Sequence, residues 1–204
     1  EDLAEAGFIG FEPLLPPRYT PPLDLLNGLD EREAEEGLYV LVQLAVLPRD
    51  ALTDGLGAEI DFNQVEVAYK RLVVSTKETP NANPEIATWR VDGVDLPPGT
   101  VLEVDPDQTY AIGLRLTDES VESYLYETPS GEVETRVEEP YAAWYANDGA
   151  VLETVTLHPY LDADWQAPDP ARGKRPSGTI WAVVRDRRGG MTWGSLDWRI
   201  RGWD

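Results

Sequence analysis

Few residues in this 204-residue chain have side chains suited to catalysis. It contains one histidine, His158, and no cysteine, which excludes a cysteine nucleophile, a thiolate metal site and a disulfide framework. A Ser-His-Asp arrangement or an imidazole metal site would have to use His158. No Gly-x-Ser-x-Gly motif and no helix-borne histidine pair accompanies it, and it follows an expected strand. We therefore predict that the protein is not an enzyme.

Closely spaced carboxylates offer a second kind of chemistry. Asp105 with Asp107, and Asp162 with Asp164, are pairs in expected loops, and oxygen-rich loops suit Ca²⁺. Neither pair extends to a full D-x-[DN]-x-[DN]-G pattern. The chain has 38 acidic residues, so pairs of the kind that a glycoside hydrolase uses also arise without a role. We predict that these carboxylates are solvated turn residues and that the protein has no cofactor. Bound calcium is the weaker alternative.

Tryptophan and arginine residues near the C-terminus are the main candidates for binding. Alternation along residues 191–200 groups Leu196, Trp198 and Ile200 on one face, so Trp193 faces outward. Exposed Trp beside Arg is typical of protein interfaces and of sugar-binding platforms. Together with apolar residues near the N-terminus, the predicted partner-binding residues are Phe8, Phe11, Leu14, Leu15, Arg185, Arg187, Arg188, Trp193, Arg199, Arg201 and Trp203.

Charge is distributed unevenly along the chain. The net charge of −21 argues against nucleic acid and anionic membranes as partners. Residues 172–204 hold eight Arg or Lys and three Asp, a net +5, which leaves −26 for residues 1–171. The charges either form solvated faces that keep the protein soluble, or the basic end docks to an acidic partner or to the acidic end of another copy.

A β-hairpin over residues 178–201 is the element that must position these side chains. Its two arms are rich in Trp, Val and Ile, and they flank a turn at residues 187–190 that ends in two glycines. We expect Trp144, Trp165 and Trp181 in the core and Trp193 and Trp203 exposed. Residues 30–38 are the only helix candidate. No apolar run reaches the roughly 18 residues that a membrane helix needs.

Strand and turn signals divide the rest of the chain. Residues 1–36 form an extended Pro-rich and acidic segment, expected to lie across the first domain or across a partner. Residues 37–80 are expected to form a separate, divergent or partial β domain, in which the apolar run 38–47 is expected to be buried on both faces. From residue 81 to 204, strands recur at the spacing of a β-sandwich. The predicted fold is all-β, with one or two β-sandwich domains.

Three segments of the second domain form a familiar combination. Trp144 precedes the turn Asp148-Gly149, residues 165–168 read W-x-A-P, and residues 178–190 end in the D-x-x-G-G turn of the hairpin. With Asn81-Ala-Asn-Pro84 ahead of them, they resemble the PKD/immunoglobulin-like domains of bacterial surface proteins. The resemblance covers about residues 80–202, and residues 38–76 look like the closing half of a more divergent domain of the same kind.

The resemblance implies an exported β-sandwich that serves as a spacer, scaffold or binding module. Such domains often sit in lipoproteins, although the lipid-bearing cysteine is absent here. The chain starts at Glu1 and its one methionine is Met191, so we expect a processed protein that is periplasmic, on the cell surface or secreted in a bacterium.

We predict a non-catalytic extracytoplasmic scaffold or accessory subunit that docks to a larger cell-envelope assembly, or that self-associates. An adhesin or carbohydrate-binding module that uses exposed aromatic residues is the alternative. A third interpretation is an accessory domain of a larger hydrolase.

Overall fold

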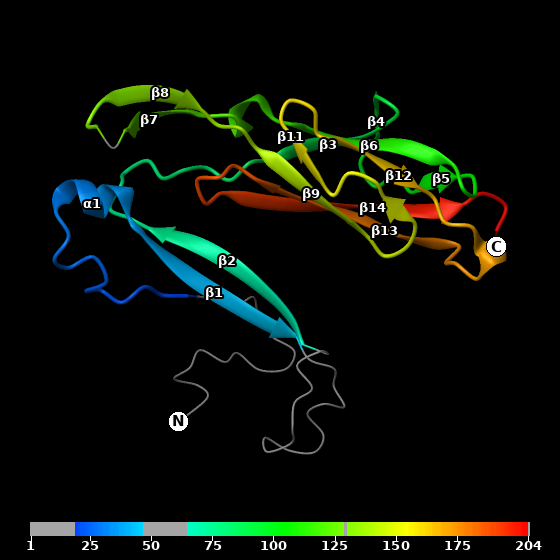
Figure 1. The fold of residues 1–204 in the computed structure, drawn as a ribbon, viewed down its shortest axis with the longest axis horizontal. Coiled ribbons are helices and arrows are strands. Elements are labelled where there is room, and N and C mark those ends of the chain that lie inside the picture. The colour runs from blue at the N-terminus through cyan, green and yellow to red at the C-terminus, as the bar shows by residue number, and fades with distance from the viewer. Residues whose placement is uncertain (1–18, 47–64, 129, 204) are drawn as a thin grey trace, which may run out of the picture. The chain divides into compact units, whose positions relative to one another are not determined.

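The computed structural model describes residues 19–46, 65–128 and 130–203 (Figure 1). Contacts divide the chain into two compact units, Glu1–Pro80 and Asn81–Asp204. Strands dominate both units, so the prediction of an all-β protein is confirmed. Phe8, Phe11, Leu14 and Leu15 lie outside the described residues.

Unit 1 contains a short helix and a hairpin. Helix α1 spans Glu31–Glu36, within the predicted range, and Asp30 caps it reciprocally: Glu33 N donates to Asp30 Oδ1 at 2.8 Å, and Asp30 N donates to Glu33 Oε2 at 3.1 Å. Strands β1, Leu38–Val46, and β2, Glu66–Val74, pair antiparallel along their whole length.

The expectation that β1 is buried on both faces is wrong in this structure. Tyr39 and Leu41 on one face are exposed, and so are Val42 and Leu44 on the other. A continuous apolar run indicates burial only when a layer covers each face, and the described residues of unit 1 form no second layer. A two-stranded hairpin of this kind is marginally stable in water.

Unit 2 is built from two five-stranded sheets and a separate hairpin. The first sheet has the order β10-β12-β6-β3-β4 and the second the order β11-β9-β13-β14-β5. Strands β7 and β8 form the hairpin, which extends from one end of the two sheets (Figure 1). The bounds are β3 Ile86–Val91, β4 Val94–Asp95, β5 Leu102–Val104, β6 Thr109–Leu116, β7 Ser123–Glu127, β8 Val133–Val137, β9 Tyr141–Ala146, β10 Ala150–Val151, β11 Val155–Leu157, β12 Asp162–Gln166, β13 Ser177–Arg185 and β14 Met191–Ile200, with 3-10 turns at Asp118–Ser120 and Pro170–Arg172.

The core of unit 2 lies between the inner faces of its two sheets, a β-sandwich-like arrangement. The rings of Trp165 from the first sheet and Trp198 from the second lie 5.3 Å apart between centroids. Trp89 meets Trp144 edge to face at 6.0 Å. Among the described residues, no helix is long and apolar enough to cross a membrane.

The predicted places of the tryptophans are confirmed with one exception. Trp144 and Trp165 are buried, and Trp193 and Trp203 are exposed. Trp181 is the exception, because it lies half-buried on the outer face of β13. The inner face of β13 is made by the smaller side chains of alternate residues, which are fully buried: Ile180, Ala182 and Val184.

Candidate functional site

The outer face of the second sheet carries aromatic and aliphatic side chains where water would favour polar ones. We call this surface the aromatic face and define it as Tyr141, Tyr145, Val155, Trp181, Val183 and Trp193. Trp193 retains 64% of its accessible surface and Tyr145 retains 54%. The others are exposed or half-buried.

The strand register places these side chains in adjacent rows. One row crosses four strands through Val155, Ala143, Val183 and Trp193. In the next row Trp181 stands opposite Tyr145 on one side and Ser195 on the other. Side chains that are directly opposite across paired strands lie close enough to touch. The aromatic face is therefore one continuous surface over β11, β9, β13 and β14.

The outer face of the first sheet has the opposite character. Asp95 accepts from Arg115 at 2.7 Å and lies 3.3 Å from Arg90, forming an ion-pair cluster at the edge. The carboxylate of Asp162 occupies the space above Gly113, where any side chain would collide with it. This is the polar outer face that an antiparallel sheet normally presents to water. The contrast marks the second sheet as the unusual one.

Arg188, one of the predicted partner-binding residues, is used within the domain. Its Nη1 donates to Oε1 of the buried Glu138 at 2.7 Å and lies 3.4 Å from Glu122. Its guanidinium also lies over the ring of Tyr124, 4.3 Å from the centroid. Arg188 therefore ties the β13–β14 turn to the base of the β7–β8 hairpin.

Other basic residues near the C-terminus also have partners inside unit 2. Arg201 binds both carboxylate oxygens of Asp105 at 2.9 Å, and Arg199 binds Glu103. Arg172 and Lys174 contact acids as well, at Asp107 and Asp148. The charge asymmetry of the sequence is thus largely neutralised within the fold.

Arg185 and Arg187 differ from these because they border the aromatic face. Arg185 stands beside Tyr141 and Met191 in the register of β9, β13 and β14. The guanidinium of Arg187 lies 5.8 Å from the Tyr141 ring centroid, and its nearest carboxylate, Glu139, is 3.8 Å away. The structure thus brings Arg185, Arg187 and Trp193 to one surface. Trp203 lies after the end of β14, 47% exposed.

The turn of the hairpin is organised by the buried Asp186. Its Oδ1 accepts from the backbone N–H groups of Arg188 at 2.7 Å and Gly190 at 2.9 Å, and its Oδ2 accepts from Asn81 Nδ2 at 2.6 Å. A Cβ at position 190 would lie 1.9 Å from this carboxylate, so glycine is required there. The D-x-x-G-G pattern is a structural device.

The predicted chemistry residues do not form a reaction centre among the described residues. His158 follows β11, half-buried, and its backbone N–H donates to Pro140 O at 2.8 Å. Asp105 and Asp107 are taken by Arg201 and Arg172, while Asp162 lies over Gly113. No group of three or more His, Asp or Glu in the described ranges is arranged to hold a metal ion.

Two carboxylates in unit 2 have lowered pKa values. A hydrogen bond from the Arg175 N–H at 2.8 Å, with a second from the Gly149 N–H, lowers the pKa of Asp148 below its usual 3.8. The side-chain hydrogen bond from Arg199, and then its charge, lower the pKa of Glu103. Both carboxylates join segments that are distant in sequence, so they belong to the scaffold.

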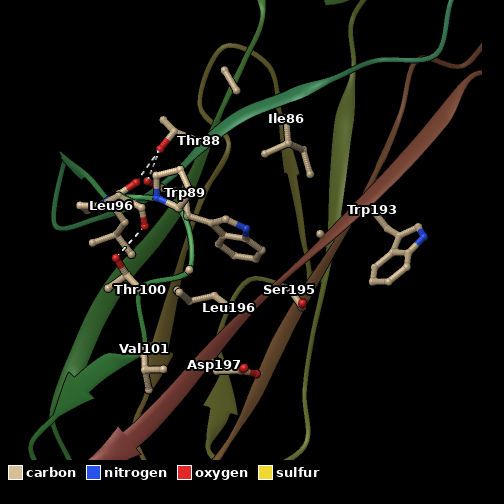
Figure 2. Close-up of a pocket in the computed structure, with 15 residues that line it drawn as sticks. Ile86, Thr88, Trp89, Leu96, Thr100, Val101, Trp193, Ser195, Leu196 and Asp197 are labelled. Atoms are coloured by element: carbon tan, nitrogen blue, oxygen red, sulfur yellow. Dashed lines mark hydrogen bonds between the residues drawn. The ribbon is translucent and has the colours of Figure 1, made fainter.

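A groove opens at the edge of the sandwich, between β3 and β14 (Figure 2). Its volume is about 490 Å³, and Ile86, Trp89, Leu96 and Val101 form its apolar part. Figure 2 shows the Trp89 indole pointing into the groove, whereas Trp193 projects to the other side of β14. The groove therefore adjoins the aromatic face along β14.

No family model, no curated protein and no solved structure matches this chain.

Sequence reasoning missed most of the aromatic face, although a signal was present. Trp181, Val183 and Arg185 share one side of β13 by simple alternation. The charge of Arg185 indicates that this side is the outer one, and Trp181 lies on the same side. Tyr145 lies opposite Trp181 only because β9 pairs with β13, and no local pattern contains that pairing.

Proposed function

We propose that this protein is a non-catalytic extracytoplasmic scaffold or accessory subunit that docks to a larger cell-envelope assembly through its aromatic face. The observation that carries the proposal is the contrast between the two outer faces of unit 2. The outer face of the first sheet is polar and carries ion pairs, whereas that of the second sheet presents Tyr145, Trp181 and Trp193 to solvent. Contiguous apolar surface on a soluble domain is typical of interaction sites.

The composition of the aromatic face suits a protein partner. Tyr, Trp and Arg are the residues that most often dominate binding energy, and they act best at the centre of a patch from which water is excluded. Trp193 and Trp181 supply the large rings, while Arg185 and Arg187 lie at the border. The partner would cover the rings and place carboxylates beside the two arginines.

The PKD/immunoglobulin-like resemblance supports an exported location, in the periplasm or at the cell surface of a bacterium. Its motifs serve as packing devices in unit 2: Trp165 of the W-x-A-P segment is core, and Asp186 of the D-x-x-G-G turn is a buried acceptor. Domains of this kind carry function on their surfaces, which agrees with a binding role. The apolar residues of segment 1–36 are proposed to dock as well.

The test is capture of envelope partners by the full chain. Purified protein is cross-linked in an envelope extract of the source bacterium, and bound proteins are quantified by mass spectrometry. The double variant Trp193→Ser/Tyr145→Ser should lose at least tenfold of a specific partner. Leu125→Ser, which removes an even more exposed apolar side chain on β7, is the matched control and should capture normally.

Two results would overturn the docking role. One is a chain that stays monomeric and captures no protein, and the other is equal capture by the double variant. For the N-terminal segment, deletion of residues 1–36 should weaken partner association. Unchanged association would remove that segment from the proposal.

An adhesin or carbohydrate-binding module is the second candidate, favoured by the exposed aromatic side chains of the same surface. Sugar rings stack on Trp and Tyr side chains that lie on a rigid sheet, and Trp181 and Tyr145 are cross-strand neighbours. Binding on a glycan array that Trp193→Ala abolishes, without a captured protein, would favour this candidate over the scaffold.

A further inference from the structure

The edge of the second sheet is incomplete beside the groove. Strand β5 pairs with β14 only at Trp198–Ile200, because the chain enters β5 at Leu102 after leaving the turn at Pro97 and Pro98. Among the residues that the structure describes, the preceding part of β14 has β13 on one side and no strand on the other. This open stretch lines the groove together with β3.

The direction of the backbone groups along this open stretch follows from the hydrogen-bond alternation. Asp186 N donates to Gly190 O across the hairpin. The backbone N–H and C=O groups of even-numbered residues in β14 therefore point to β13, and those of odd-numbered residues point to the edge. Met191 and Arg201 confirm the alternation, since their N–H groups bond away from β13, to Asn83 Oδ1 and to Val104 O.

By the same alternation, Trp193 and Ser195 point their backbone N–H and C=O groups into the open side. None of the hydrogen bonds described for the structured residues engages these groups. Two donors and two acceptors in register are the complement of an extended peptide backbone.

The space beside the open edge suits such a peptide. Gly194 has no side chain, so Ile86 and Trp89 reach over it and form an apolar wall facing the edge. Side chains of an added strand would alternate between this wall and the ring of Trp193 on the other side. Asp197 is the only charged residue among those that line the groove.

We propose that the open edge of β14 is a strand-addition site for an extended peptide of another protein, about five residues long, with apolar side chains at alternate positions. Its flanks should be neutral or basic, because the chain carries −21 and the groove carries Asp197. This site uses backbone groups at the sheet edge and shares Trp193 with the aromatic face, so a change to the backbone at Ser195 tests it apart from docking on that face.

The test selects decapeptides from a random phage-displayed library against the full chain. Ser195→Pro removes the N–H that points into the open side, at a position where proline is tolerated in an edge strand. Ser195→Ala keeps that N–H and is the matched control. Selected peptides should show period-two apolar patterning, bind the parent and Ser195→Ala alike, and bind Ser195→Pro at least tenfold more weakly.

Synthetic peptides provide an arm that does not depend on how the proline variant folds. Two versions of a selected peptide are compared, one N-methylated at its odd-numbered residues and one at its even-numbered residues. One of these two methylation phases should abolish binding, and the other should leave it intact. The proposal is overturned if no peptide is enriched, if Ser195→Pro binds normally, or if both methylation phases bind. Concentration-dependent dimerisation that Ser195→Pro abolishes would also overturn it, since a second copy would then occupy the edge.

Discussion

At the residue scale, the buried carboxylates of unit 2 are each matched by specific donors. Glu138 is 2% exposed at its side chain, and its Oε2 accepts from the Glu122 N–H while its Oε1 receives Arg188. A buried ion pair need not stabilise a fold relative to apolar packing, but removal of one partner leaves an uncompensated charge. Arg188 is therefore better explained by stability than by docking.

We predict that Arg188→Ala lowers the free energy of unfolding by about 3 kcal/mol, because it leaves the buried Glu138 carboxylate without its cationic partner. Its sequence neighbour is the control: Arg187→Ala should change stability by less than about 0.5 kcal/mol, since its contacts are at the surface. Urea unfolding followed by tryptophan fluorescence measures both, because all seven tryptophans lie in unit 2. Equal effects would contradict the assignment of Arg188.

Asp148 gives a prediction about acid. Its folded pKa is lowered, so its stabilising effect is complete above the unfolded value near 3.8 and is lost as the pH falls through the lower folded value. The stability difference between the parent and Asp148→Asn should therefore be larger at pH 6 than at pH 2. Parallel curves of unfolding free energy against pH would show that the charge at position 148 has no such role.

At the element scale, the turns of unit 2 hold the sheets in register through close packing. Gly149, between β9 and β10, has φ +82°, and a Cβ there would lie 2.5 Å from Trp165 Nε1 and from Gln166 O. The Trp165 Nε1 also donates to Asp148 O at 3.2 Å. The Trp strand, the Asp-Gly turn and the W-x-A-P segment thus form one packing unit.

Gly149→Ala should cost about 3 kcal/mol or more, combining left-handed strain with displacement of Trp165. Gly173→Ala isolates the strain, because Gly173 has φ +78° with no atom within 4 Å of its ideal Cβ, and it should cost about 1 kcal/mol. Thermal or urea unfolding measures both. If the two variants lose the same stability, the contact with Trp165 contributes nothing.

The two faces of β13 show why the element has to be seen in its sheet. Ile180, Ala182 and Val184 are small enough to fit between the sheets, and Trp181 takes the other side. Tryptophan has the largest apolar side chain of the four, yet it lies on the outer face. The space between the sheets favours the smaller side chains on the inner face. Arg185 and Trp181 lie on the same side of β13, and the charge of Arg185 favours the outer position for that side.

At the scale of the whole molecule, the buried core found among the described residues lies in unit 2. Some of its ion pairs join residues that are distant in sequence. Arg199 in β14 pairs with Glu103 in β5, and Arg201 just after β14 pairs with Asp105 just after β5. Exposed pairs of this kind contribute little each, about 0–1 kcal/mol. Their role is to satisfy the basic residues locally, which leaves the aromatic face as the distinctive surface.

A fragment of residues 81–204 should fold without the first 80 residues, because the buried apolar cluster lies entirely within it. We expect a near-ultraviolet circular dichroism signal from its packed tryptophans and one cooperative urea transition. A fragment with neither property would show that unit 2 depends on residues outside its own core.

Local sequence patterns were sufficient to predict the all-β class, the helix at residues 30–38 and the final hairpin. These features depend on alternation, turn glycines and capping side chains, all of which act over a few residues. The same logic predicted the burial of Trp165 and the exposure of Trp193. It could not assign Arg188 or Arg201, because their partners Glu138 and Asp105 are 50 and 96 residues away.

The location of the candidate site depends on the tertiary structure. The aromatic face exists because β11, β9, β13 and β14 are neighbours, and the open edge exists because β5 covers only the end of β14. Both depend on pairings between segments far apart in the chain. Tyr145 and Trp181 become one surface only when those pairings form.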